Sequence, residues 1–169
     1  SDTTDIEILQ AKLKQVPSME GLELSSKVST KKPYFVGSPN AKRKVAVMDF
    51  GVKKNIIRNL VDRDCYVQVF PANTKYKDIH DWEPDGIMMS NGPGDPATMT
   101  DVISNIKDIL KQNIPLFGIC LGQQLLAQAC GVGTYKMFNG HRGINHPVKN
   151  IITGRCEITS QNHGFSVIE

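Results

Sequence analysis

The segment Gly118–Gln124 restricts what this chain can fold into more than any other. It follows the apolar run Ile114–Phe117 and precedes Leu125–Cys130, which is rich in helix-forming residues. A strand that ends in G-x-C-x-G and turns at once into a helix is the thiol form of a nucleophile elbow. Its glycines permit a tight turn, and unpaired N–H groups at the helix start lower the pKa of a thiol. The segment therefore predicts that Cys120 is a nucleophile; the alternative is a buried cysteine that acts as a small apolar residue.

Short apolar runs alternate with helical patterns from residue 45 onward. The predicted buried strands are Val45–Met48, Tyr66–Phe70, Gly86–Met89 and Ile114–Ile119, and helical spacing of apolar residues falls between them, over Ile56–Val61 and Val102–Leu110. This alternation predicts an α/β fold with an open, mostly parallel sheet and helices on both faces. Ligands of such sheets bind beyond the carboxyl ends of the strands. The chain after Gly131 carries only short β-like pieces, at Gly133–Met137, Val148–Ile152, Glu157–Thr159 and Phe165–Ile168.

The character of the sequence changes near residue 44. An amphipathic helical pattern, Ile6–Leu13, stops before Pro17, and the polar stretch Lys31–Lys44 is interrupted by prolines and glycine in the manner of a linker. We therefore expect residues 1–44 to be the end of another unit together with a linker, and not a self-sufficient domain. Residues 45–169 then form the main domain.

Composition excludes several classes of function. The formal net charge of +3 is too small to indicate nucleic-acid binding, and no apolar run approaches the roughly 20 residues that span a bilayer. The N-terminal residues lack the pattern of a signal peptide. Four cysteines without CxxC pairs suit a reducing compartment. We expect a cytoplasmic protein that binds neither nucleic acid nor membrane and has no metal site.

A second candidate segment, Ser90–Pro96, directly follows the predicted strand Gly86–Met89 and should meet Cys120 at the same sheet edge. Gly92 and Gly94 carry no side chain, so backbone N–H groups there can approach a ligand closely. A thiolate that attacks an amide creates an oxyanion, and each donor to it lowers the barrier by about 3 kcal/mol. We assign this oxyanion hole to the N–H groups of Gly92 and Leu121. The alternative is a rigid turn; phosphate-loop spacings are absent.

A third candidate segment is Thr159–Phe165. Asn162 supplies both a hydrogen-bond donor and an acceptor, and Gly164 permits close approach of the backbone. Asparagine beside glycine is equally typical of a simple turn. The residues by themselves leave both interpretations open.

Together these segments resemble the class I, triad-type, glutamine amidotransferases. Ser90–Pro96 and Gly118–Gln124 are shared in outline with the whole class. Three further segments resemble, more narrowly, the small glutaminase subunits of carbamoyl phosphate synthetases: Val47–Arg58, Asn139–Lys149 and Ser160–Phe165. The resemblance runs from about residue 21 to residue 169.

The resemblance implies a reaction and a set of site residues. In that family a cysteine attacks the carboxamide of L-glutamine, ammonia leaves, and water hydrolyses the glutamyl thioester. Cys120 would be the nucleophile. The residues that would hold the substrate are Gly92, Gly94, Leu121, Gln124, Asn162, Gly164 and Phe165. Gln124 lies one helical turn after Cys120, which agrees with a place in the same pocket.

The resemblance also implies a partner. Ammonia would pass to a large synthetase subunit, which binds ATP, magnesium and bicarbonate and makes carbamoyl phosphate for pyrimidine and arginine biosynthesis. This chain itself would need no cofactor. The family's histidine and glutamate, which complete the triad, belong to a later segment that residues 1–169 do not contain. The resemblance therefore implies a domain truncated on its C-terminal side, and it makes residues 1–44 the tail of the family's N-terminal domain plus a linker. We expect little glutaminase activity from residues 1–169 alone.

The four histidines are weak substitutes for that base. We expect His80 at the surface, and His141 and His146 in a loop with a structural or partner-facing role. His163 neighbours Asn162, but the resemblance assigns that segment to substrate binding. Acid–base catalysis would also require hydrogen-bond reach to Cys120.

Two other functions stay open. One is the glutaminase component of another amidotransferase, such as one that makes anthranilate or guanylate; the sequences of Asn139–Lys149 and Ser160–Phe165 disfavour it. The other is a non-catalytic docking module on the same scaffold, which the intact elbow at Cys120 disfavours. Labelling by an electrophilic glutamine analogue separates the catalytic interpretations from the docking module.

Overall fold

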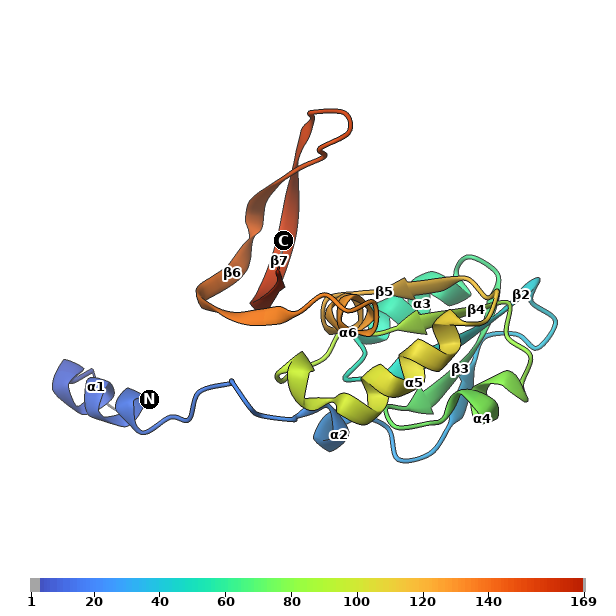
Figure 1. Ribbon diagram of the computed structural model, residues 1–169, viewed down its shortest axis with the longest axis horizontal. Helices are drawn as coiled ribbons and strands as arrows, with labels where there is room; N and C mark the ends of the chain where they lie inside the picture. The colour runs from blue at the N-terminus through green and yellow to red at the C-terminus, as the bar shows by residue number, and fades with distance from the viewer. Residues whose placement is uncertain (1–3, 169) are drawn as a thin grey trace.

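The structure, a computed structural model, describes residues 4–168 (Figure 1). The helices are α1 (Ile6–Lys14), α2 (Ser25–Val28), α3 (Lys54–Val61), α4 (Tyr76–His80), α5 (Thr100–Leu110) and α6 (Leu121–Ala129), with a short 3-10 helix, η1 (Pro96–Thr98). The strands are β1 (Tyr34–Val36), β2 (Arg43–Asp49), β3 (Cys65–Pro71), β4 (Gly86–Met89), β5 (Leu116–Gly118), β6 (Thr134–Lys149) and β7 (Cys156–Val167). None of the helices in this described part is long and apolar enough to cross a membrane.

The central sheet has five strands in the order β1-β3-β2-β4-β5. Strands β3, β2, β4 and β5 are parallel, with Val47 of β2 opposite Val69 of β3 and Met89 of β4 opposite Gly118 of β5. These strands coincide with the apolar runs of the sequence, although β5 is shorter than the run that predicts it. The mostly parallel α/β architecture is confirmed.

Helices pack on both faces of this sheet because its inner strands are apolar on both sides. On one face, Ile57 of α3 belongs to a cluster with Val47, Val67 and Val69. On the other face, α5 and α6 cover alternate strand residues such as Met48. Each such side chain stabilises the fold by about 1.5–3 kcal/mol when it is fully removed from water. The packed sheet is thus a firm base for the loops at its carboxyl edge.

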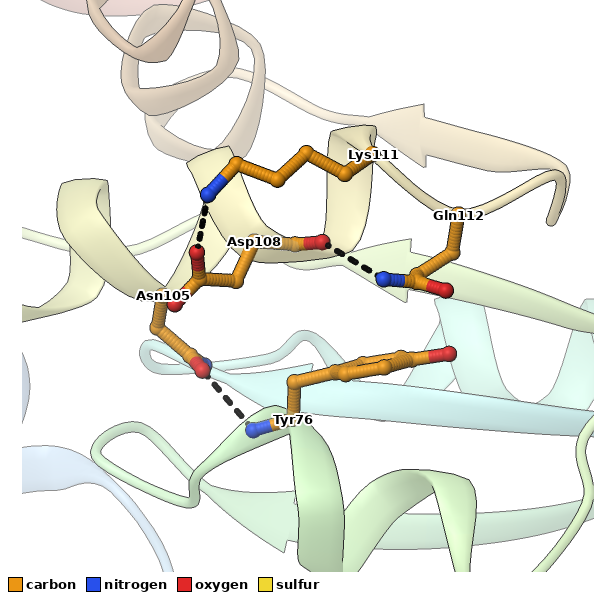
Figure 2. Close-up of polar contacts among 5 residues, drawn as sticks. All are labelled: Tyr76, Asn105, Asp108, Lys111 and Gln112. Atoms are coloured by element: carbon orange, nitrogen blue, oxygen red, sulfur yellow. Dashed lines mark hydrogen bonds and ion pairs between the residues drawn. The ribbon is translucent and has the colours of Figure 1, made fainter.

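Hydrogen bonds from α5 fix the start of α4 (Figure 2). The buried Asn105 side chain accepts from the Tyr76 backbone N–H at 2.7 Å and donates to the Thr74 carbonyl at 2.9 Å. At the exposed end of α5, Asp108 forms an ion pair with Lys111 at 2.7 Å. A buried amide with both of its sides engaged contributes more to stability than an exposed ion pair does.

The interpretation of residues 31–44 as a linker is wrong in part. Tyr34–Val36 forms the edge strand β1, which pairs antiparallel with β3, and β2 already begins at Arg43. The Phe35 ring stacks on Tyr66 with ring centroids 5.2 Å apart. This segment therefore belongs to the sheet. The division of the chain at residue 44 stays a prediction.

The chain after α6 forms one long antiparallel hairpin, β6–β7, and not the separate short pieces that its sequence predicts. The hairpin extends away from the sheet and its helices (Figure 1). Two register shifts interrupt the pairing, between Lys136 and His141 and between Gly143 and His146. Its exposed apolar side chains include Phe138, Ile144, Ile151, Ile152 and Ile158.

Candidate active site

Cys120 occupies the sharp turn between β5 and α6, as the elbow motif predicts. Its backbone has φ 52° and ψ −108°, a conformation that residues with a side chain rarely adopt. The strain therefore lies in the cysteine itself. Gly118 and Gly122 are needed for a different reason: a Cβ on Gly118 would lie 2.6 Å from the Gln123 nitrogen, and one on Gly122 would lie 2.3 Å from the Met89 carbonyl oxygen. The glycines let β4, β5 and α6 approach each other closely.

The loop after β4 lies directly beside this elbow. Gly122 donates its N–H to the Ser90 carbonyl at 3.0 Å, and Ile119 donates to the Met89 carbonyl at 3.0 Å. A Cβ on Gly92 would lie 2.1 Å from the Phe50 carbonyl oxygen. The missing side chain at Gly92 thus serves the packing behind the loop, which sequence reasoning did not foresee. It also sets the loop against the end of β2.

The segment from Gly21 to Ser25, which leads into α2, contacts the same loop from its other side. Asp95 donates its N–H to the Leu22 carbonyl, and its carboxylate accepts from the Gly21 N–H, both at 2.9 Å. Ser25 Oγ donates to the Pro93 carbonyl at 3.1 Å. Gly94 has φ 105°, a left-handed conformation that favours glycine. These contacts fix the loop that carries the predicted oxyanion donor.

The hairpin supplies the wall opposite this loop. The Cys120 Sγ lies 4.0 Å from the Asn162 carbonyl oxygen of β7. The buried Gln124 side chain donates from Nε2 to the Phe165 carbonyl at 2.8 Å, and the Phe165 ring is itself buried. Helix α6 therefore starts directly after the nucleophile and carries the amide that ties the hairpin to it.

A cavity of about 860 Å³ opens between the elbow, the loop and the hairpin. The predicted site residues that line it are Gly92, Gly94, Cys120, Gln124, Asn162, Gly164 and Phe165. Leu121 is the exception: its side chain lies in the core, and its backbone N–H faces the Cys120 sulfur. The structure thus brings the sequence-predicted residues to one place. Their individual roles stay predictions.

The pKa of the Cys120 thiol is raised, whereas the sequence predicts that it is lowered. Desolvation of the thiol by burial is the largest cause. The Leu121 backbone N–H and the positive charge of Lys53 act in the opposite direction and only partly offset it. The expected helix-terminus effect is present, but desolvation exceeds it.

Three cationic side chains line the cavity and escaped the sequence interpretation: Lys53, Lys136 and Arg142. Arg142 donates from Nη1 to the Asn162 Oδ1 at 2.7 Å, across the hairpin. No Asp or Glu side chain of residues 4–168 lines this cavity. The signal that could have found Arg142 is its register opposite Asn162, which becomes visible only once the hairpin pairing is known.

His80 is exposed at the end of α4, as expected, whereas two other histidines differ from the expectation. His141 and His146 lie in strand β6 and not in a loop. His163 lines the cavity, but its Nδ1 bonds the Phe165 carbonyl at 2.7 Å, while its Nε2 lies 2.9 Å from Gln161 Oε1 and 3.2 Å from His141 Nδ1. Both ring nitrogens are therefore engaged away from Cys120. Within residues 4–168 no three His, Cys, Asp or Glu side chains gather as a metal site requires.

Comparison with known proteins identifies the family that this chain matches. The family model described as glutamine amidotransferase class-I matches residues 46–169. The chain is 47% identical over 165 residues to the carbamoyl phosphate synthase small chain of Chlorobaculum tepidum, covering 96% of this chain and 45% of that protein. It is 50% identical to the protein of the same name from Bacillus cereus, covering 98% of this chain and 44% of the relative. This chain therefore spans less than half the length of these relatives.

Solved structures share the fold at lower identity. A glutamine amidotransferase from Methylobacillus flagellatus has a TM-score of 0.56 and 20% identity, covering 76% of this chain and 58% of that one. A glutamine amidotransferase from Thermotoga maritima has a TM-score of 0.53 and 20% identity, covering 75% and 62%. At this level of identity the likeness concerns the arrangement of the strands and helices alone.

Proposed function

Because this chain belongs to the class I glutamine amidotransferase family, we propose that its cavity is a glutaminase site. Cys120 attacks the side-chain carboxamide of L-glutamine there. The observation that carries the proposal is the position of Cys120, strained at the elbow with its sulfur facing a cavity of about 860 Å³. A lone buried cysteine would need neither the strain nor the cavity.

The chemistry follows from a sulfur nucleophile and an amide. The thiolate adds to the carboxamide carbon, the C–N bond breaks, and the nitrogen leaves as ammonia after taking up a proton. A glutamyl thioester to Cys120 results. Water then attacks the thioester carbon, which releases glutamate and returns the thiol. Both addition steps place a negative charge on the carbonyl oxygen.

Two backbone donors are proposed to stabilise that oxyanion. The Leu121 N–H already faces the Cys120 sulfur, and the Gly92 backbone lies in the cavity wall. Donors held by the fold need no reorganisation when the charge develops, and each is worth about 3 kcal/mol. Because the Gly92 loop is bound on both sides, at Ser90 and at Asp95, it is suited to this role.

The remaining residues are proposed to hold the substrate. Gly94, Gln124, Asn162, Gly164 and Phe165 surround Cys120 from three elements. The Gln124 amide nitrogen is already bonded to the Phe165 carbonyl, so its contribution is to fix the hairpin wall, with its oxygen left for the ligand. The part of the lining that residues 4–168 provide has no carboxylate, which suits a ligand that carries one.

The ammonia is proposed to serve a synthetase subunit that forms carbamoyl phosphate for pyrimidine and arginine biosynthesis. This part of the proposal rests on the similarity to carbamoyl phosphate synthase small chains. ATP, magnesium and bicarbonate would be bound by that large subunit. We propose a cytoplasmic hetero-oligomer.

Residues 1–169 should hydrolyse L-glutamine slowly, whereas an electrophilic analogue of glutamine should still alkylate Cys120. His163, the histidine that lines the cavity, has both ring nitrogens engaged elsewhere. The raised pKa of Cys120 leaves less thiolate at neutral pH. Without a base, such a site retains only the acceleration that its oxyanion hole and substrate binding provide.

Labelling with the chloromethyl ketone analogue of L-glutamine tests the proposal. We expect one equivalent to add, peptide mapping to place it on Cys120, and excess L-glutamine to slow the reaction. Cys130 and Cys156 are exposed free thiols in the same chain and serve as internal references for non-specific alkylation. The Cys120→Ser variant should lose the protected adduct.

The outcome separates the alternatives. Labelling that L-glutamine does not slow, or that falls equally on Cys130 and Cys156, contradicts a glutaminase site and favours a docking module on the same scaffold. Protection by L-glutamine without detectable glutamate release agrees with the proposed slow turnover. Rapid glutamate release by the chain contradicts the turnover prediction alone.

A further inference from the structure

We propose that Arg142 binds the α-carboxylate of the substrate and so selects an anionic amide over a neutral one. This inference rests on the proposed glutaminase function. It adds a residue that neither the sequence motifs nor the family resemblance assigns to the site.

The cavity wall carries three cationic side chains and, among residues 4–168, no carboxylate. An opening lined by one sign of charge attracts ligands of the opposite sign. Free L-glutamine carries a carboxylate at one end and the reactive carboxamide at the other. The charge pattern therefore favours the binding of the whole amino acid, with its carboxylate toward a cation.

The other two cations are less suited to a carboxylate than Arg142, because one packs on the Phe165 ring and the other lies beside the nucleophile. Lys136 donates from Nζ to the Met137 carbonyl at 2.6 Å, and its ammonium lies 5.9 Å from the centre of the Phe165 ring. Lys53 exerts its charge on the Cys120 sulfur, where the carboxamide end must react. A carboxylate bound at Lys53 would thus compete with the nucleophile for the same charge.

Arg142 is both anchored and available. Its Nη1 makes the 2.7 Å bond to Asn162 Oδ1, which is the guanidinium's one hydrogen bond among residues 4–168. The Nη2 lies 3.4 Å from where a Cβ on Gly164 would be, so the guanidinium extends over that glycine. A guanidinium has five N–H donors in a planar fork that matches a carboxylate. The donors that face Gly164 are free for the ligand.

This arrangement explains why a residue without a side chain occupies position 164. Gly164 lines the cavity between Arg142 and Lys136. A Cβ there would contact the Arg142 guanidinium at 3.4 Å and the Lys136 ammonium at 3.8 Å, so a larger side chain would crowd both cations. Arg142 is held across the hairpin, opposite Asn162, by the pairing of β6 with β7. The hydrogen bond to Asn162 already restricts the exposed guanidinium, which reduces the entropy lost on binding a carboxylate.

The test compares two probes that differ only in the carboxylate: the chloromethyl ketone analogue of L-glutamine and its methyl ester. In the unmodified chain the acid should label Cys120 faster than the ester, and added salt should slow the acid more than the ester. In Arg142→Gln the acid should label about 10- to 100-fold more slowly, as expected for loss of a charge-assisted hydrogen bond. The ester should be little affected, and Arg142→Lys should restore part of the rate.

The matched control is Lys149→Gln, which removes an equal charge from the same strand at an exposed position outside the cavity. It should leave both probes unchanged. Equal slowing of acid and ester in Arg142→Gln would show a purely structural role and overturn the inference, as would an unchanged acid rate. If L-glutamine fails to protect Cys120 in the unmodified chain, it is the glutaminase function itself that fails. The comparison of acid with ester in the unmodified chain needs no variant to fold.

Discussion

The sheet and the hairpin make opposite contributions to the same cavity. Around the elbow, backbone atoms of β4, β5 and α6 approach so closely that Gly118 and Gly122 tolerate no Cβ. The hairpin is mostly exposed, with Phe138 99% and Ile152 92% accessible to solvent. Dense packing holds the nucleophile in a strained conformation, whereas a lightly attached arm carries the residues proposed to recognise the substrate.

The difference in packing determines which region can maintain backbone strain. A positive φ at Cys120 costs about 1–3 kcal/mol and persists only where surrounding contacts over-determine it. The sheet provides such contacts, and the hairpin does not. The hairpin's attachment depends on a few interactions, of which the buried Phe165 and the bond between Gln124 and the Phe165 carbonyl are central. Substitutions should therefore act differently in the two regions.

The largest effect is expected at the elbow. In Gly122→Ala the new Cβ would lie 2.3 Å from the backbone oxygen of Met89, which cannot move without shifting β4. We expect the free energy of unfolding to fall by about 3 kcal/mol, and labelling of Cys120 to be lost with it. Thermal and urea unfolding measure the first quantity.

The matched control for this substitution is Gly86→Ala, at the start of β4, the strand against which Gly122 packs. A Cβ there meets its nearest atom, the Pro115 oxygen, at 3.4 Å, an ordinary contact. Its effect should stay below about 1 kcal/mol. Equal stabilities of the two variants would contradict the assignment of tight packing to the elbow.

A smaller and more local effect is expected at the base of the hairpin. Phe165→Ala removes a buried ring that holds β7 against α6, so the hairpin should detach more readily while the sheet stays folded. We expect amide exchange to accelerate in β6 and β7, corresponding to about 2 kcal/mol of lost docking free energy. Exchange in β2 and β3 should hardly change.

The control is Phe138→Ala on the same hairpin, where the ring is already exposed to solvent. This variant should leave exchange unchanged throughout. If Phe165→Ala instead unfolded the sheet and the hairpin together, the two regions would form one cooperative unit, which contradicts a hairpin that detaches independently.

The smallest effect is expected on the pKa of Cys120, which lies between the sheet and the hairpin. Burial raises the pKa of Cys120 and Lys53 lowers it, so the thiolate forms only at a pH above the ordinary range for cysteine. The rate of alkylation by neutral iodoacetamide should rise with pH through that raised pKa. Lys53→Met should move the profile further toward high pH, because the charge that favours the thiolate is gone.

Lys54→Met is the control, since it removes the neighbouring cation at an exposed position and is not among the causes of the Cys120 shift. Its profile should match that of the unmodified chain. A profile that moves to lower pH in Lys53→Met would contradict the assigned direction of the Lys53 field.

Much of the sheet was predictable because its signals are local. Continuous apolar runs mark the parallel strands, and the carboxyl ends of parallel strands share one edge, so the meeting of Cys120 with the Gly92 loop followed from sequence. Strand β1 was missed because three residues, Tyr34–Val36, gain their order from a partner strand some thirty residues onward. A segment that short carries no periodicity of its own.

The hairpin was less predictable than the sheet, and so was the direction in which the pKa of Cys120 is shifted. Glycines and a proline interrupt the apolar pattern between Asn139 and Val148, which made one strand resemble several pieces and loops. The partnership of Arg142 with Asn162 depends on a register that includes two irregularities. The raised pKa of Cys120 depends on desolvation of the thiol in the folded chain, whereas the motif alone indicates only the effect of the helix terminus.

The two-sided construction of the cavity has a thermodynamic consequence. A ligand that touches the elbow and β7 together binds only the chain in which both are docked, so its binding free energy adds to the hairpin's attachment by mass action. Near saturation, at a hundred times the dissociation constant, that linkage amounts to about 2.7 kcal/mol. Occupancy of the site is thereby converted into order along β6 and β7, well beyond the atoms that the ligand contacts.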